Sequence, residues 1–143
     1  MDINENVAQL KERLNKDSGD IDAAISLGNI YYDAGDAGQA ILYYRRALDI
    51  NPDLPAVRTD LGTMYWRNND ISMSEQEFRA AISSDAGFGH AYVNLGLLLH
   101  RAKNDVSAAR ALWQKLLDIN PGHDAAAKAR ELLQETSSQA TKH

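Results

Sequence analysis

Histidines, serines and carboxylates are the side chains in this chain that could catalyse a reaction or bind a metal ion. The histidines are His90, His100, His123 and His143, and there is no cysteine. His90 and His100 are ten residues apart in a segment expected to be helical. The helical rise separates them by roughly 15 Å, too far to share one metal ion. Because no zinc-binding histidine motif or calcium loop is present either, we predict no metal site and no cofactor.

Catalysis finds no more support than metal binding. The glycine-containing segment 33–38 lacks the Lys-Ser/Thr that completes a phosphate-binding loop, so it is interpreted as a turn. No strained serine motif or other triad signature is present. Carboxylate pairs such as Glu75 and Glu77 are expected on a helix surface. We therefore predict no catalytic residue, and a chain that is not an enzyme.

Composition indicates one globular unit. The chain has 143 residues, of which 44% are hydrophobic, and a net charge of −5. Residues 1–88 are acidic on balance while residues 89–123 are basic, so no clustered basic face for nucleic acid is expected. No apolar run is long enough to span a membrane, and the acidic start does not resemble a signal peptide. We expect a soluble chain that does not insert into membranes and is cytoplasmic by default.

A period of 34 residues organises the chain. The dipeptide Leu-Gly recurs at Leu27-Gly28, Leu61-Gly62 and Leu95-Gly96, and this spacing is typical of stacked helix-turn-helix units. Glycine in the middle of a helix costs roughly 1 kcal/mol relative to alanine. Its return at one position therefore indicates close approach of another helix. Aromatic residues follow each glycine on the expected second helix, at Tyr44, Phe78 and Trp113.

With the small residues Ala40, Ser74 and Ala109 and the prolines Pro52 and Pro121, this pattern resembles the tetratricopeptide repeat, W-x2-L-G-x2-Y, A-x3-F, P. The resemblance covers residues 21–123. It implies an all-α, right-handed superhelix of three hairpins, at 21–54, 55–88 and 89–123. The third unit has one extra residue between Leu99 and Ala109, for which we predict a longer turn inside that hairpin.

Segments outside the repeats are expected to cap the array. In residues 1–20, Ile3, Val7, Leu10 and Leu14 form one apolar stripe of an amphipathic helix, interpreted as an N-terminal cap or a half-repeat. Residues 124–135 are expected to form a C-terminal capping helix with Asp124 as its N-cap. Residues 136–143 lack an apolar pattern and are predicted to be disordered.

The resemblance also implies that the first helix of each unit lines a concave face. The predicted groove residues are Ile25, Asn29, Tyr32, Asp33, Thr63, Trp66, Arg67, His90, Val93, Asn94, Leu97, His100 and Arg101. Tryptophan, tyrosine and arginine around an apolar strip are typical of binding hot spots. We therefore predict a scaffold that binds a peptide or helical segment of a protein partner. Tyr32 and Trp66 would anchor that segment, with an acidic end toward Arg67 and Arg101.

A specialised groove of the family grips the C-terminal carboxylate of chaperones, and this chain resembles it only at Asn29. At the other clamp positions the chain has Ile25, Asp60, His90 and Asn94. Asp60 would repel a carboxylate, so we do not expect this form of recognition.

The alternative hypothesis is a structural module that associates with itself or with further repeats, as in bacterial assembly or cytochrome c maturation factors. Its contacts would be made by the capping helices or by an uncovered end of the array. Binding that depends on groove residues favours the scaffold. A homo-oligomer lost on deletion of residues 1–16 favours self-association.

Overall fold

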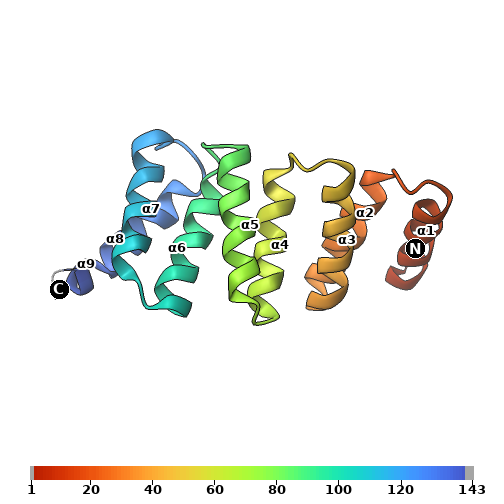
Figure 1. Ribbon diagram of the computed structural model, residues 1–143, viewed down its shortest axis with the longest axis horizontal. Coiled ribbons are helices and arrows are strands. Elements are labelled where there is room, and N and C mark those ends of the chain that lie inside the picture. Colours follow the sequence, from red (N-terminus) through yellow and green to blue (C-terminus); the bar gives the residue numbers. More distant parts are fainter. Residues whose placement is uncertain (1, 141–143) are drawn as a thin grey trace.

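The computed structural model describes residues 2–140, and for Ala140 the backbone only. All regular secondary structure in this range is helical, and the helices stand side by side in a row (Figure 1). Their bounds are α1 Ile3–Lys16, α2 Ile21–Asp33, α3 Ala37–Ile50, α4 Pro55–Arg67, α5 Ile71–Ser84, α6 Gly89–Lys103, α7 Val106–Ile119, α8 Ala126–Glu135 and α9 Ser137–Ala140. Within residues 2–140, no helix is both long and apolar enough to cross a membrane.

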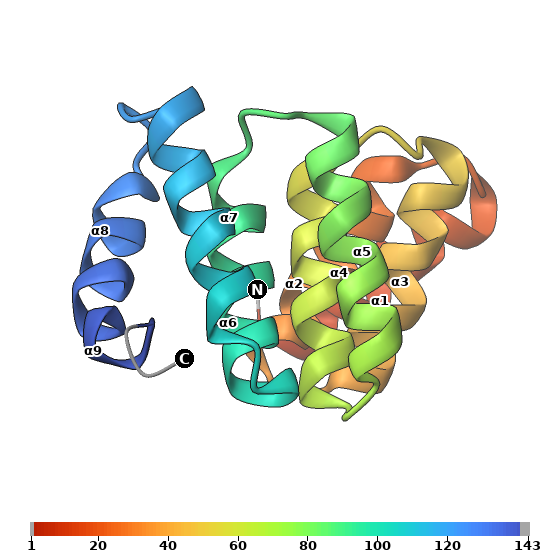
Figure 2. The same ribbon diagram turned by 60° about the vertical axis from the view of Figure 1, so that its left-hand side comes forward.

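Three hairpins, α2–α3, α4–α5 and α6–α7, make up most of the row, and each falls within one of the predicted repeat ranges. Each helix packs against the next one along the chain. In addition, α4 contacts both α2 and α6, so the first helices of the three hairpins are neighbours (Figure 2). This arrangement gives the molecule one surface made by first helices alone.

The turn inside each hairpin uses the same two devices. Asp36, Asp70 and Asp105 are N-caps whose carboxylates accept a hydrogen bond from a backbone N–H of the second helix. Before each aspartate stands a residue with positive φ, namely Gly35, Asn69 or Asn104, the types that tolerate this conformation best. The turn of each hairpin is therefore fixed by residues within the turn itself.

The prediction of a longer turn in the third hairpin was wrong. α6 is 15 residues long where α2 and α4 have 13, and only Asn104 and Asp105 separate it from α7. The extra residue extends the helix because Arg101, Ala102 and Lys103 are good helix formers. Asn104 then ends the helix in the left-handed conformation.

Each repeated glycine makes room for the aromatic residue of its own hairpin. A Cβ built on Gly28 would lie 2.5 Å from Tyr44, one on Gly62 2.6 Å from Phe78, and one on Gly96 2.1 Å from Trp113. These distances are shorter than van der Waals contact, so a side chain at any of the three positions would push the two helices apart. The 34-residue period thus marks the place in each hairpin where an aromatic ring of the second helix packs directly on the glycine of the first.

The N-terminal helix α1 follows its predicted stripe only in part. Leu10 and Leu14 are buried and Val7 is half-buried, but Ile3 is 57% exposed. Because α1 packs against α2 alone among the described helices, its first turn stays uncovered and only the later part of the stripe is covered. Arg13 holds the junction with a two-pronged ion pair to Asp20, the N-cap of α2.

The C-terminal helix α8 buries Ala126, Ala129 and Leu132 and packs against α7. Its N-cap is Ala125, with no side-chain cap. The predicted N-cap Asp124 instead places its carboxylate beside His123 and His90.

The predicted disorder from residue 136 onward was also wrong for the residues that the structure describes. Thr136 is 3% exposed, and its hydroxyl donates to the Leu132 carbonyl at 2.7 Å. Arg110 donates to the Thr136 hydroxyl and to the Leu133 carbonyl. These contacts hold the chain on α7 and lead into α9, whereas residues 141–143 of that prediction lie outside the described range.

Candidate functional site

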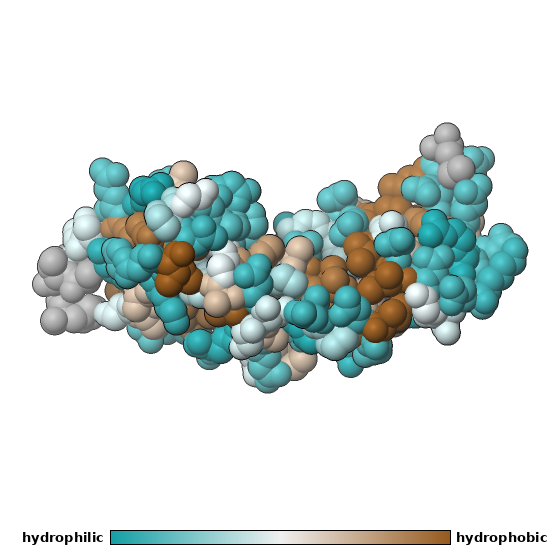
Figure 3. All heavy atoms as spheres, turned by 90° about the horizontal axis from the view of Figure 1, so that it is seen from above, coloured by the Kyte–Doolittle hydropathy of each residue, from teal (hydrophilic) through white to brown (hydrophobic). Residues whose placement is uncertain are grey.

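The candidate site lies on the surface made by α2, α4 and α6, hereafter the groove. All of the groove residues predicted from the sequence belong to these three helices. Seen from above, the outline of the molecule is hollowed between its two ends, and hydrophilic and apolar side chains are intermixed on it (Figure 3). Two features stand out in the groove, an aromatic–arginine cluster and a polar pocket.

The aromatic–arginine cluster joins α2 to α4. The Arg67 guanidinium carbon lies 5.1 Å from the centre of the Tyr32 ring, within the range of a cation–π contact. Arg67 is exposed and Tyr32 half-buried. Burial, followed by the negative charge of Asp60, raises the pKa of Tyr32, so its hydroxyl stays protonated and able to donate.

Trp66 extends this cluster toward α6. It is half-buried and packs at the margin of the hydrophobic cluster that α6 and α7 dominate, whereas Tyr32 packs against the cluster of the first hairpins. Both rings therefore keep part of their surface open to solvent. A rigid aromatic side chain held in this way loses little entropy when a ligand covers it.

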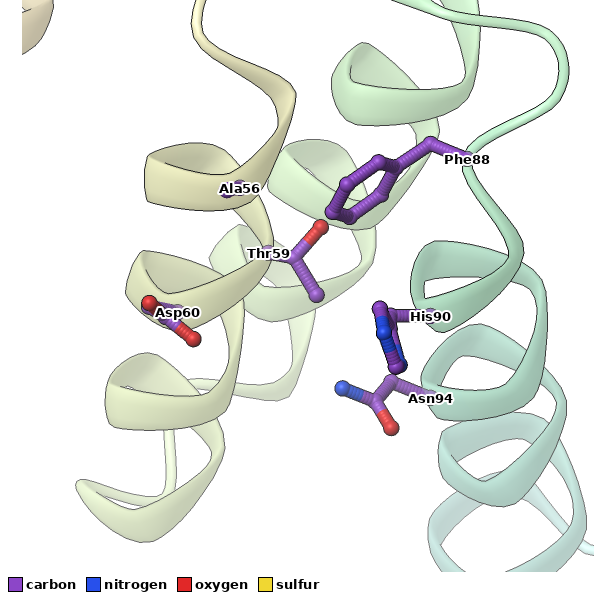
Figure 4. A pocket seen from close by; sticks show the side chains of 6 residues that line it. All are labelled: Ala56, Thr59, Asp60, Phe88, His90 and Asn94. Atoms are coloured by element: carbon purple, nitrogen blue, oxygen red, sulfur yellow. The ribbon is translucent and has the colours of Figure 1, made fainter. Parts of the chain in front are cut away.

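The polar pocket lies between α4 and the start of α6 and has a volume of about 280 Å³. It is lined by Ala56, Thr59, Asp60, Phe88, His90 and Asn94. His90 and Asn94 project from α6 toward α4, and the Phe88 ring approaches Thr59 (Figure 4). Pro55 occupies the first position of α4, where its missing N–H does no harm, and the next residue, Ala56, lines the pocket.

Asp60 is the distinctive group of the pocket. Burial raises its pKa to about 6, and the charge of Asp33 adds to this rise while His90 opposes it. Within residues 2–140, no hydrogen bond or ion pair reaches the Asp60 carboxylate. A half-buried carboxylate without a partner is unfavourable when ionised, and a cationic group entering the pocket would relieve this.

The pH dependence of stability provides a test of this environment. The folded chain holds the Asp60 proton up to about pH 6, whereas the unfolded chain releases it near 3.8. Asp60 therefore favours folding below pH 3.8, and this contribution is lost as the pH rises to about 6. We expect Asp60→Asn to raise the free energy of unfolding at pH 7, by on the order of 1 kcal/mol after allowance for solvent screening.

This effect is measured by urea unfolding of the wild type and the variant at several pH values between 3.5 and 7.5, roughly spanning the two titrations. The difference between the two proteins should shrink toward acidic pH, because both then carry a neutral side chain. A difference that is constant across the range would show that the Asp60 carboxylate is not destabilised by burial.

The structure does not leave every predicted groove residue available. Val93 is only 6% exposed and belongs to the hydrophobic core around Trp113, so its assignment to the groove was wrong. The Asn29 side-chain oxygen accepts a hydrogen bond from the Tyr44 hydroxyl at 2.7 Å. The His100 ring packs edge-on against Trp113, with 6.5 Å between ring centres.

All of the predicted residues except Val93 keep some exposure. The exposed set comprises Asn29, Asp33, Arg67, His90 and Arg101, and the half-buried set comprises Ile25, Tyr32, Thr63, Trp66, Asn94, Leu97 and His100. Of the pocket residues, Ala56 and Phe88 were missed as groove members, and Asp60 was considered only as a clamp position. Phe88 stands between two glycines just before α6. It lies outside the repeated positions around Leu95-Gly96, so the repeat pattern does not predict that it faces α4.

Comparison with known proteins gives matches along most of this row of helices. A family model described as TPR repeat matches residues 28–69, and another described as tetratricopeptide repeat matches residues 59–124. The type IV pilus assembly protein PilF of Pseudomonas aeruginosa is 29% identical over 69% of this chain and 38% of its own length. RNA polymerase II-associated protein 3 of Rattus norvegicus is 26% identical over 81% of this chain and 18% of its own length.

The chain thus spans well under half the length of these curated relatives. Among solved structures, MamA superposes with a TM-score of 0.75 at 19% identity, covering 96% of this chain and 90% of that one. The Sgt2 TPR domain from Aspergillus fumigatus gives 0.72 at 22% identity, with 86% and 82% covered. The first TPR of Spaghetti, bound to an HSP90 peptide, gives 0.68 at 21% identity, with 82% and 95% covered. At these identities the structures establish the fold.

Proposed function

Because the chain belongs to the tetratricopeptide repeat family, we propose that it is a non-catalytic scaffold that binds a peptide or helical segment of a partner protein in the groove. The observation that carries this proposal is the clustering of Tyr32, Trp66 and Arg67 on neighbouring first helices, partly open to solvent. Tyrosine, tryptophan and arginine are the types that dominate binding energy at protein interfaces.

Structural neighbours support a peptide ligand. Besides the Spaghetti domain with the HSP90 peptide SRMEEVD, the second TPR domain of human RPAP3 was solved with the HSP70 peptide SGPTIEEVD and superposes with a TM-score of 0.65. Binding of a short segment by this fold favours the scaffold over the self-association hypothesis. Self-association of this chain remains an outcome that the experiment below distinguishes.

The charges of the groove suggest which segment it takes. Asp60 lies in the pocket, in the second turn of α4, while Arg67 lies at the end of the same helix. Seven residues of helix separate the two, a rise of roughly 10 Å. We propose that the bound segment places a cationic group at Asp60 and an acidic group toward Arg67 and Arg101, so that each meets an opposite charge. A terminal carboxylate in the pocket would instead face Asp60.

Site-specific photo-crosslinking tests this function. A photoreactive residue at Thr63, in the groove, is compared with one at Leu42, which is 48% exposed on the second helix α3. We expect a partner protein to crosslink through position 63 and not through position 42. Equal capture at both positions, or capture of a second copy of this chain through α1, would contradict the proposal.

A further inference from the structure

His90, His123 and Asp124 come together at one edge of the polar pocket. One nitrogen from each imidazole and one oxygen of the carboxylate lie within 4.8 Å of one another. His90 stands in the first turn of α6, whereas His123 and Asp124 lie in the connection between α7 and α8. The sequence gives no sign of this cluster, because 33 residues separate His90 from His123.

Packing holds the cluster in place. A Cβ on Gly89 would lie 2.5 Å from His123 Nδ1, so glycine at this position lets the imidazole lie directly on the start of α6. The Phe88 ring meets both imidazoles edge-on, with ring centres 5.6 Å from His90 and 6.2 Å from His123. His123 is 18% exposed and is the anchored member, while His90 and Asp124 are more open, at 51% and 77%.

The electron-rich atoms of the cluster face one another. Asp124 Oδ1 lies 2.8 Å from His123 Nδ1 and 3.4 Å from His90 Nε2. The Ala125 N–H donates to the same Nδ1 at 2.9 Å, and an imidazole nitrogen that accepts this bond has no proton to give to Asp124. A carboxylate oxygen and a nitrogen lone pair are thus brought together where a cation would stabilise both.

We propose that His90, His123 and Asp124 bind a divalent transition-metal ion such as Zn²⁺. Two imidazoles and one carboxylate suit this class of ion. Ligands at tetrahedral corners with bonds near 2.0 Å lie about 3.3 Å apart, which is close to the 2.8 and 3.4 Å between Asp124 Oδ1 and the two imidazole nitrogens. Three protein ligands leave a fourth position for water or an exchangeable ligand. Competition from the Ala125 N–H and the exposure of two ligands place the expected dissociation constant in the micromolar range, about 1–50 μM.

Metal binding has a structural consequence that does not depend on partner binding. The ligands come from α6 and from the connection that leads into α8, so the ion would cross-link the last hairpin to the C-terminal capping helix. An ion that binds only the folded chain raises its melting temperature. The site therefore has two independent readouts, the affinity for the metal and the stability of the chain.

The test is titration of the purified chain with Zn²⁺ by calorimetry, and with Co²⁺ by its visible absorption. We expect one saturable site in the wild type and at least about tenfold weaker binding in His90→Ala and in Asp124→Asn. Both residues are exposed, so these variants should fold, as circular dichroism will show. His100→Ala is the matched control, since it removes a histidine of the same helix outside the cluster.

Zn²⁺ should also raise the melting temperature of the wild type and of His100→Ala, but not that of His90→Ala. Absence of saturable binding below about 1 mM Zn²⁺ would overturn the proposal. So would binding that His90→Ala and His100→Ala weaken equally, because the ion would then not distinguish the cluster from other surface histidines.

Discussion

Replacing Trp113 with alanine is expected to lower the free energy of unfolding by about 3–5 kcal/mol. Trp113 is completely buried, lies against Gly96, and donates its indole N–H to the Val93 carbonyl at 3.3 Å. The substitution removes a large aromatic ring from between α6 and α7 and leaves a cavity beside Gly96. Since a domain of this size is stabilised by only about 5–15 kcal/mol, the variant should be close to unfolding at elevated temperature.

Urea unfolding followed by circular dichroism measures this loss, and the other tryptophan of the chain supplies the control. Trp66 is only half-buried, so Trp66→Ala should cost less than half as much. Similar losses for the two variants would mean that the ring at position 113 is not the central packing element of its hairpin.

The double variant Trp66→Ala, Arg101→Glu is expected to abolish binding of the native partner, a loss of at least about 100-fold in affinity. Trp66 provides the aromatic surface nearest α6, and Arg101 is exposed at the end of that helix, where a glutamate would repel an acidic group of the ligand. Neither side chain is fully buried. The helical circular dichroism should therefore remain nearly unchanged, and the melting temperature should fall no further than in the Trp66→Ala variant described above.

The matched control for this variant is Leu42→Ala, Lys115→Glu. It also removes one exposed apolar side chain and reverses one positive charge, but it does so on the second helices α3 and α7. Affinity measured with the captured partner should be the same as for the wild type. If the groove variant binds normally, or if the control loses affinity equally, the groove assignment is wrong.

The repeat architecture could be predicted from the sequence because its signals are local and recur. A glycine that must accept an aromatic ring, as Gly62 accepts Phe78, constrains residue type at one place in every hairpin. The turn of the third hairpin was predicted incorrectly because length alone does not say where an extra residue goes. The extra residue lengthens α6 because the residues there favour a helix, and Asn104 ends that helix in the left-handed conformation.

The site was harder to predict because it depends on which faces of different helices meet. Val93 has the spacing of a groove residue, yet the core around Trp113 covers it. Asp60 falls at a clamp position, but its raised pKa comes from burial and from the charge of Asp33 on the neighbouring helix α2, which the repeat pattern does not show. His123 meets His90 only through the path of the α7–α8 connection, on which the repeat pattern has no influence.

The most direct test of the central claim is the structure of this chain bound to the segment of its partner that crosslinks at position 63. Our account predicts that the segment lies against α2, α4 and α6, covers Trp66 and places a cationic group beside Asp60. A segment bound to α1, to α8 or to the second helices α3, α5 and α7, with Trp66 still open to solvent, would contradict it.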